Sequence, residues 1–169
     1  MQVCTEETAT FNCSIERAFK APILGDATRF LTGYMFQPPI AGFEEDETWG
    51  TPGGVRFPVT NGNLLVPKGR LLRDETVERI ENEYWKWMVY DFEVWSLFFT
   101  TKGVGEWYVK DNHNGTVHVR YIYTYTSRNW LTYPLNWLFV QTQVKGVMKK
   151  AIKGIQLQAE SGEPFVYKN

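Results

Sequence analysis

Near the C-terminus, apolar residues recur at the spacing of an amphipathic helix over residues 135–160. On a helical wheel centred on Val144, the lysines fall on one side and the apolar residues on the other. The apolar arc holds Trp137, Val140, Val144, Val147, Met148, Ala151, Ile152 and Ile155, and Gln141 falls inside it. Thr132 can serve as N-cap and Pro134 suits the first turn. The pattern predicts one long helix packed across a sheet.

Most of the chain before this helix has the alternation of β-strands. A first strand is expected over residues 8–20 and a short helix over 24–34, followed by an acidic connector over 41–48. Asn61-Gly62 is typical of a two-residue hairpin. In the strand before it, Val55, Phe57 and Val59 share one face. The later strands are predicted at residues 71–81 (an outer strand), 84–92, 103–110 and 116–126.

This order predicts an α+β fold in which an antiparallel meander carries its helices on one face. At 169 residues the chain is expected to form one domain with a sizeable core. The net charge of −1 gives no electrostatic reason to expect binding to nucleic acid or to anionic membranes. No apolar run approaches the length of about 20 residues that a membrane span needs.

The N-terminal residues lack the basic and apolar regions of a signal peptide, so we expect a cytoplasmic protein. Cys4 and Cys13 lie too far apart on one extended strand to form a disulfide, which suits a reducing compartment. Neither His113 nor His118 has the neighbours of a metal site or a catalytic triad. Residues 50–54 lack the Lys-Ser/Thr ending of a P-loop. We therefore expect no metal, no cofactor and no catalytic residue.

The chain resembles the SRPBCC superfamily, the START-like or helix-grip proteins that include polyketide cyclases and lipid-transfer domains. The resemblance covers nearly the whole chain and rests on the element order together with residues 15–22 (IERAFKAP), Trp49-Gly50 and Gly54-Val55-Arg56. It implies a single START-like domain over residues 1–169, in which a curved antiparallel sheet wraps around the long C-terminal helix and leaves a cavity between them. A lipocalin barrel is the alternative fold, disfavoured because a helix interrupts the first two strands. The connector 35–54, at the cavity entrance, stays unassigned.

Aromatic residues make up 16% of the chain, and many share one face of a predicted strand. Tryptophan and tyrosine are poor filler for a dry core because each buried N–H or hydroxyl needs a partner, but they make good pocket walls. With the helix face added, the expected cavity residues are Trp85, Trp87, Val89, Trp107, Val119, Tyr121, Tyr123, Tyr125, Gln141, Val144, Val147 and Met148. Alternatively, these residues simply pack against the helix.

The resemblance and the aromatic face together favour a module that binds a small, largely apolar molecule, such as a lipid, a sterol or an aromatic polyketide-like compound. One alternative is a cyclase or dehydratase in which tyrosines or Asp91 act as general acid or base. The other is a protein-interaction module like the family's chaperone-activator branch, which would need an exposed apolar patch. The oligomeric state is left open.

Overall fold

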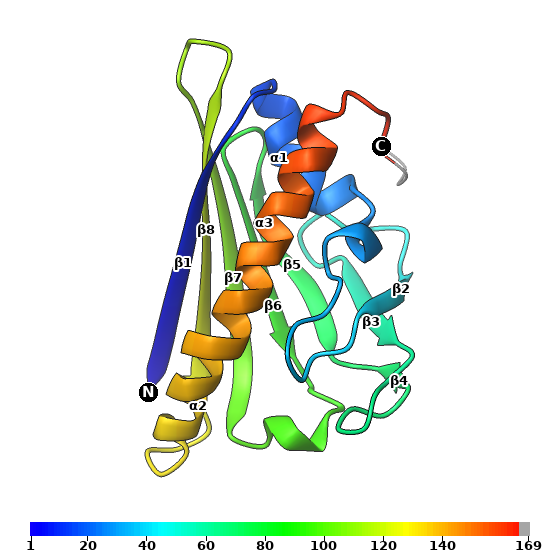
Figure 1. Cartoon of the computed structure of the whole chain (residues 1–169), viewed down its shortest axis with the longest axis vertical. Coiled ribbons are helices and arrows are strands. Elements are labelled where there is room, and N and C mark those ends of the chain that lie inside the picture. The colour runs from blue at the N-terminus through cyan, green and yellow to red at the C-terminus, as the bar shows by residue number, and fades with distance from the viewer. Residues whose placement is uncertain (166–169) are drawn as a thin grey trace.

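The computed structural model describes residues 1–165, which form a curved antiparallel sheet gripping a long helix (Figure 1). The strands run in the spatial order β1-β8-β7-β6-β5-β3-β2, and the short β4 pairs with β3. Their bounds are β1 (Gln2–Phe11), β2 (Ile40–Glu45), β3 (Val55–Thr60), β4 (Gly69–Arg70), β5 (Arg73–Ile80), β6 (Tyr84–Tyr90), β7 (Thr100–Asp111) and β8 (Val117–Ser127).

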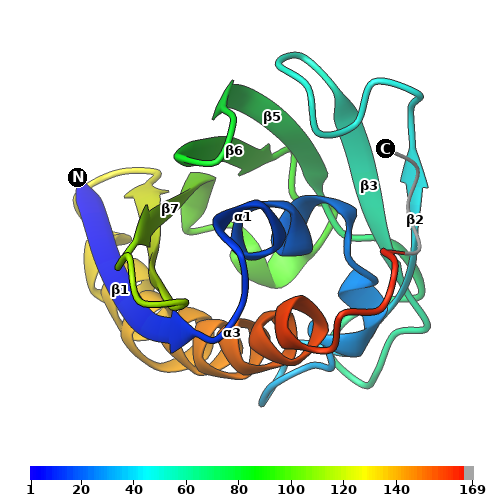
Figure 2. The same ribbon diagram turned by 90° about the horizontal axis from the view of Figure 1, so that it is seen from above.

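The helices lie on the concave side of this sheet, as the view from above shows (Figure 2). The long helix is continuous through α2 (Tyr133–Phe139), the π-helical η3 (Val140–Val144) and α3 (Lys145–Glu160). The other helical elements are α1 (Ile15–Leu24) and the short 3₁₀ turns η1 (Ala27–Arg29) and η2 (Trp95–Leu97). This arrangement is the α+β helix-grip fold that the sequence predicted. No helix within residues 1–165 is both long and apolar enough to cross a membrane.

The N-terminal prediction of a strand over 8–20 is wrong beyond Phe11, because a helix begins at Ile15. The Ser14 side chain accepts a hydrogen bond from the Arg17 amide at 3.3 Å and so caps the first turn. The alternating pattern continued through this cap and concealed it. The expected helix over 24–34 is also wrong, since only the single turn η1 forms there, capped by Asp26.

Three predictions for the middle of the chain are wrong. The acidic connector 41–48 is largely the edge strand β2. Asn61-Gly62 does not form a two-residue hairpin, because the Asn63 side chain accepts from the amides of Leu65 and Val66 and widens the loop. The strand predicted as outer at 71–81 is β5, which lies inside the sheet between β3 and β6.

The π-helical segment η3 changes which residues of the long helix face inward. A π segment inserts one extra residue, so a wheel set on Val144 is out of phase before it. Trp137, expected on the apolar side, is accordingly 49% exposed. Asn136 and Gln143 are buried instead.

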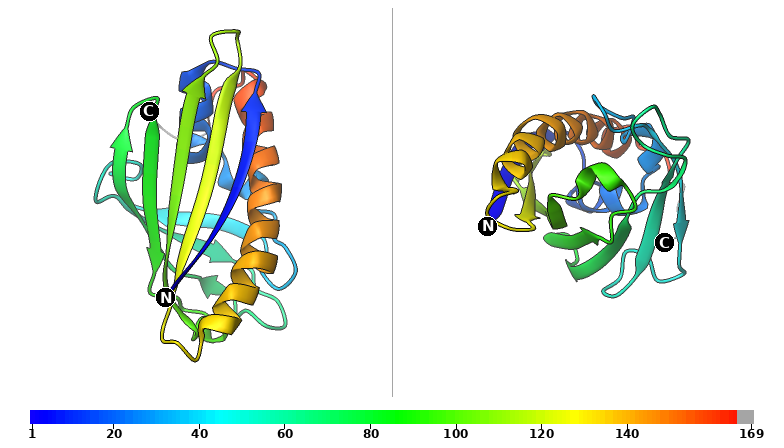
Figure 3. Two further views of the ribbon diagram at one scale, coloured as in Figure 1. Left: turned by 90° about the vertical axis from the view of Figure 1, so that its left-hand side faces the viewer. Right: turned by 90° about the horizontal axis from the view of Figure 1, so that it is seen from below.

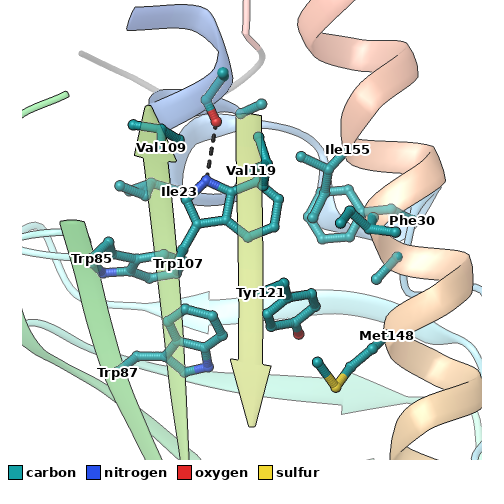
Figure 4. Close-up of a cluster of buried hydrophobic side chains, with 14 of the residues drawn as sticks. Ile23, Phe30, Trp85, Trp87, Trp107, Val109, Val119, Tyr121, Met148 and Ile155 are labelled. Atoms are coloured by element: carbon teal, nitrogen blue, oxygen red, sulfur yellow. Dashed lines mark hydrogen bonds between the residues drawn. The ribbon is translucent and has the colours of Figure 1, made fainter. Parts of the chain in front are cut away.

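The main core lies between the sheet and α1 and α3. Phe11, Phe19 and Val119 are fully buried there. The Trp107 indole donates a 3.1 Å hydrogen bond to the Ala18 carbonyl, which ties α1 to β7 (Figure 4). The end of the fold near α1 is therefore packed solidly.

Side chains of the long helix also bond to the backbone of the edge strand β1 and the residue after it. The Gln141 and Gln156 amides donate to the carbonyls of Cys4 and Thr10, at 3.2 and 3.1 Å. The Glu160 carboxylate accepts from the Asn12 amide at 2.8 Å. These contacts, together called the β1 seam, fix the helix along that edge.

Candidate ligand-binding cavity

A cavity of about 540 Å³ lies between the concave face of the sheet and the long helix. Its walls are mostly apolar side chains from β6, β7 and β8 on one side and from α2, η3 and α3 on the other. It exists because the sheet curves away from the helix beyond the packed core. The end of the fold opposite α1 is where the wall residues become exposed, among them Phe36, Trp95 and Leu138.

Aromatic rings on adjacent strands form a continuous wall. Trp85 and Trp87 stack with their ring centroids 4.2 Å apart, and Figure 4 shows both beside Trp107 and Tyr121. The Trp87 indole donates a 2.9 Å hydrogen bond to the Tyr123 hydroxyl. Tyr123 in turn stacks on Tyr125, with centroids 5.3 Å apart. The wall is thus held by ring contacts and one internal hydrogen bond.

Two tyrosine hydroxyls on this wall are free to meet a ligand. Among the described residues, the hydroxyls of Tyr121 and Tyr125 have no hydrogen-bond partner. Burial raises the pKa of both phenols, so they stay protonated at neutral pH. Each can donate one hydrogen bond and accept others.

A buried ion pair supplies the charged part of the wall. Arg56 on β3 and Asp74 on β5 are cross-strand partners, and the Arg56 Nε donates to the Asp74 carboxylate at 2.9 Å. Both side chains line the cavity and are at most 8% exposed. The Arg56 guanidinium lies over the Trp49 and Phe43 rings, at 3.8 and 4.3 Å from their centroids.

The Asp74 carboxyl is only partly satisfied. Its Oδ1 atom is buried and lacks a hydrogen-bond partner among residues 1–165. Burial raises the pKa of Asp74, and the neighbouring Arg56 opposes this without cancelling it. The carboxyl can therefore carry a proton at a pH where an exposed aspartate would not.

The entrance loop, residues 33–38, is fastened to the helix beside the cavity. The Gln143 amide donates to the Tyr34 carbonyl and its oxygen accepts from the Phe36 amide. Lys150 donates to the Gly33 carbonyl at 3.0 Å. Gly146 lets the Tyr34 ring approach the helix, since a Cβ there would lie 2.1 Å from the ring. These contacts account for the first part of the connector that the sequence left unassigned.

Most of the predicted cavity residues lie on the wall. These are Trp85, Trp87, Val89, Trp107, Tyr121, Tyr123, Tyr125, Val144, Val147 and Met148. Val119 is instead buried in the main core, and Gln141 points to the β1 seam. Asp91, considered as a possible acid or base, is exposed after the end of β6 and is not on this wall.

Sequence reasoning missed Arg56, Asp74 and Gln143. Arg56 alternates with Val55, Phe57 and Val59, and the structure turns the opposite face of β3 inward, so Arg56, Pro58 and Thr60 are the buried residues. Asp74 alternates with Arg73 and Glu75, but this pattern indicates a buried side chain only if β5 lies inside the sheet.

The fold is shared with several solved structures. Ara h 8.0201 is 16% identical, with a TM-score of 0.69 over 96% of this chain and 100% of that chain. Norcoclaurine synthase from Thalictrum flavum, solved with dopamine and hydroxybenzaldehyde, is 8% identical, with a TM-score of 0.69 over 97% and 90%. The Zhui aromatase/cyclase from Streptomyces sp. R1128 is 13% identical, with a TM-score of 0.69 over 95% and 94%. No family model and no curated protein matches the sequence.

Proposed function

We propose that this helix-grip protein binds a small, largely apolar molecule that carries one or two hydroxyl or carbonyl groups. The observation that carries the proposal is the cavity of about 540 Å³, whose aromatic wall presents the hydroxyls of Tyr121 and Tyr125, neither of which has a hydrogen-bond partner within residues 1–165. Ligand pockets commonly measure about 300–1,000 Å³ and combine apolar walls with a few polar groups.

The shape of the wall favours a ligand with rings. A wall built largely of indole and phenol rings offers more favourable contacts to another ring than to a flexible chain. The norcoclaurine synthase structure holds two small aromatic molecules, and the aromatase/cyclase is named for forming aromatic rings. Both similarities support an aromatic or polycyclic ligand here.

A fluorescence titration with paired probes tests this proposal. We expect 2-naphthol to change tryptophan emission saturably, with a dissociation constant in the micromolar range. Tyr125→Phe should weaken 2-naphthol by up to about tenfold, the value of one hydrogen bond, and leave naphthalene unchanged. Val144→Trp, which narrows the cavity, should weaken both responses. Absence of any saturable response, or equal binding to Val144→Trp, would contradict the proposal.

A cyclase or dehydratase is the second candidate function, and Asp74 favours it. A carboxyl with a raised pKa beside a guanidinium can give a proton to a ligand carbonyl and take one back. The test is incubation with β-hydroxy and poly-β-ketone compounds, followed by mass spectrometry for loss of water. Turnover by the wild type that Asp74→Asn abolishes, with ligand binding retained, would establish the enzyme. Turnover that survives Asp74→Asn would exclude this role for Asp74.

The cytoplasm remains our proposed location. Cys4 and Cys13 are both free thiols, which suits a reducing compartment.

A further inference from the structure

Four chain segments at the cavity entrance expose large apolar side chains. They are residues 33–38, 61–68, 94–99 and 128–138, here called the mouth ring. The exposed apolar residues of the cavity wall all belong to it, namely Phe36, Leu65, Trp95, Leu135 and Leu138. The ring therefore surrounds the route by which a ligand would enter.

The outermost side chains of the mouth ring are largely exposed. Leu64 is 99% exposed, Trp130 73%, Trp95 72% and Leu131 66%. Apolar surface of this extent gathered around one opening is unusual for a soluble protein and marks an interaction site.

The segments of the mouth ring are held together in pairs. The Asn63 amide donates to the Phe36 carbonyl at 3.0 Å, which joins the first two segments. Arg128 Nε donates to the Phe98 carbonyl at 2.7 Å, which joins the last two. The view from below looks onto this end of the molecule (Figure 3). The ring thus consists of loop tips that hydrogen bonds join in pairs around an opening.

The mouth ring contains no acidic residue. The chain has 19 Asp and Glu residues, yet none falls in these four segments, whose charged residues are Lys68 and Arg128; the exposed Asp91 and Glu93 come just before the third segment. Carboxylates would be repelled by lipid phosphates and costly to desolvate, whereas lysine and arginine can extend toward the headgroups.

From these observations we propose that the mouth ring docks on the surface of a phospholipid bilayer, an interaction beyond the ligand binding proposed above. Tryptophan, phenylalanine and leucine at loop tips can insert independently at the depth where headgroups meet acyl chains. A bilayer deforms around separate tips and places acyl chains over the opening. An apolar ligand could then pass between membrane and cavity without crossing water. A folded protein partner would have to fill the opening with a matching projection.

Vesicle flotation with a matched pair of variants tests the proposal. The probe is vesicles of pure phosphatidylcholine, in low salt and in 1 M NaCl. We expect the wild type to float with the vesicles in both, because apolar insertion is not screened by salt. Leu131→Asp should lower the bound fraction at least tenfold. Leu157→Asp, on α3 and with Leu157 71% exposed, should leave it unchanged.

Each other outcome overturns the proposal. Wild-type protein that stays unbound, or equal loss in both variants, would remove the mouth ring as a membrane site. Gel filtration tests whether a second copy of the chain covers the mouth ring instead. This would hold if the wild type forms a dimer that Leu131→Asp dissociates and does not bind vesicles. The fluorescence titration uses probes dispersed in water, so its result does not depend on whether the protein binds vesicles.

Discussion

The indole of Trp87 lies directly against the backbone of Gly105, its partner across β6 and β7. A Cβ atom on Gly105 would lie 2.1 Å from the indole Cε2, far inside any contact distance. The Trp87 ring can therefore take its place in the aromatic wall only because this position has no side chain.

Gly105→Ala should push the Trp87 ring out of place. We expect the free energy of unfolding to fall by about 1–3 kcal/mol, the usual cost of overpacking, measured by chemical denaturation. The matched control is Gly42→Ala on β2, where a Cβ meets nothing within 4 Å. Its effect should stay within about 0.5 kcal/mol. Equal effects at the two glycines would contradict the packing described for Trp87.

Tyr123→Phe should destabilise the fold, because it leaves the Trp87 indole N–H without its acceptor. The expected loss is about 1–3 kcal/mol. Tyr121→Phe removes a hydroxyl that has no partner among the described residues and should be neutral or stabilising. Thermal unfolding of both variants gives the comparison, and a larger loss for Tyr121→Phe would reverse our assignment of the two hydroxyls.

Gln143→Leu should release the entrance loop from the helix. Both ends of the Gln143 amide bond to this loop, so hydrogen exchange should speed up at the amides of residues 34–37. Gln141→Leu is the control, since Gln141 contacts β1 instead. It should leave those amides and ligand affinity unchanged. Faster exchange in the loop of Gln141→Leu would mean that the two glutamines are coupled through the helix.

Asp74 should make stability depend on pH in an unusual direction. The pKa of Asp74 is raised in the folded state. The stability that its protonated form contributes is therefore fully present below the unfolded pKa of about 3.9, and it is lost as pH rises through the folded pKa. Asp74→Asn keeps the neutral form at every pH. Its free energy of unfolding relative to wild type should therefore increase from about pH 4 upward and then level off, as measured by urea denaturation.

Glu6 provides a control of the opposite sign. The Arg120 guanidinium, which pairs with both oxygens of Glu6, lowers the pKa of that carboxyl. The stability it contributes is present above the unfolded pKa and is lost as pH falls through the folded value. The free energy of unfolding of Glu6→Gln, relative to wild type, should thus fall as pH rises from the folded pKa of Glu6 to its unfolded pKa. The same trend for Asp74→Asn would refute the raised pKa.

The strands of the aromatic wall could be predicted because one pattern governed them. The alternation is unbroken on β6, holds over residues 103–110 of β7 and is broken on β8 only at Ile122, and the strand pleat then determines which side chains share a face. Most of the wall residues could be predicted from this alternation. At Ser14 the same reasoning failed, because a single cap converted an alternating run into a helix.

The charged residues of the wall depended on pairing between distant strands. Asp74 faces inward only because β5 lies between β3 and β6, which no local pattern indicates. Gln143 was missed for a different reason. The extra residue in η3 shifts the helical phase, so the inward glutamine is two positions later than the wheel indicates.

The β1 seam has a consequence for the protein's behaviour in concentrated solution. The outward carbonyls of an edge strand are a template on which a second chain can add a strand and begin to aggregate. Gln141 and Gln156 occupy two such carbonyls, at opposite ends of β1. The other edge, β2, carries Glu44, which pairs with Arg70, and the exposed Glu45, whose charge repels a like strand. Resistance to fibril formation is thus built into both margins of the sheet, by hydrogen bonding at one and by charge at the other.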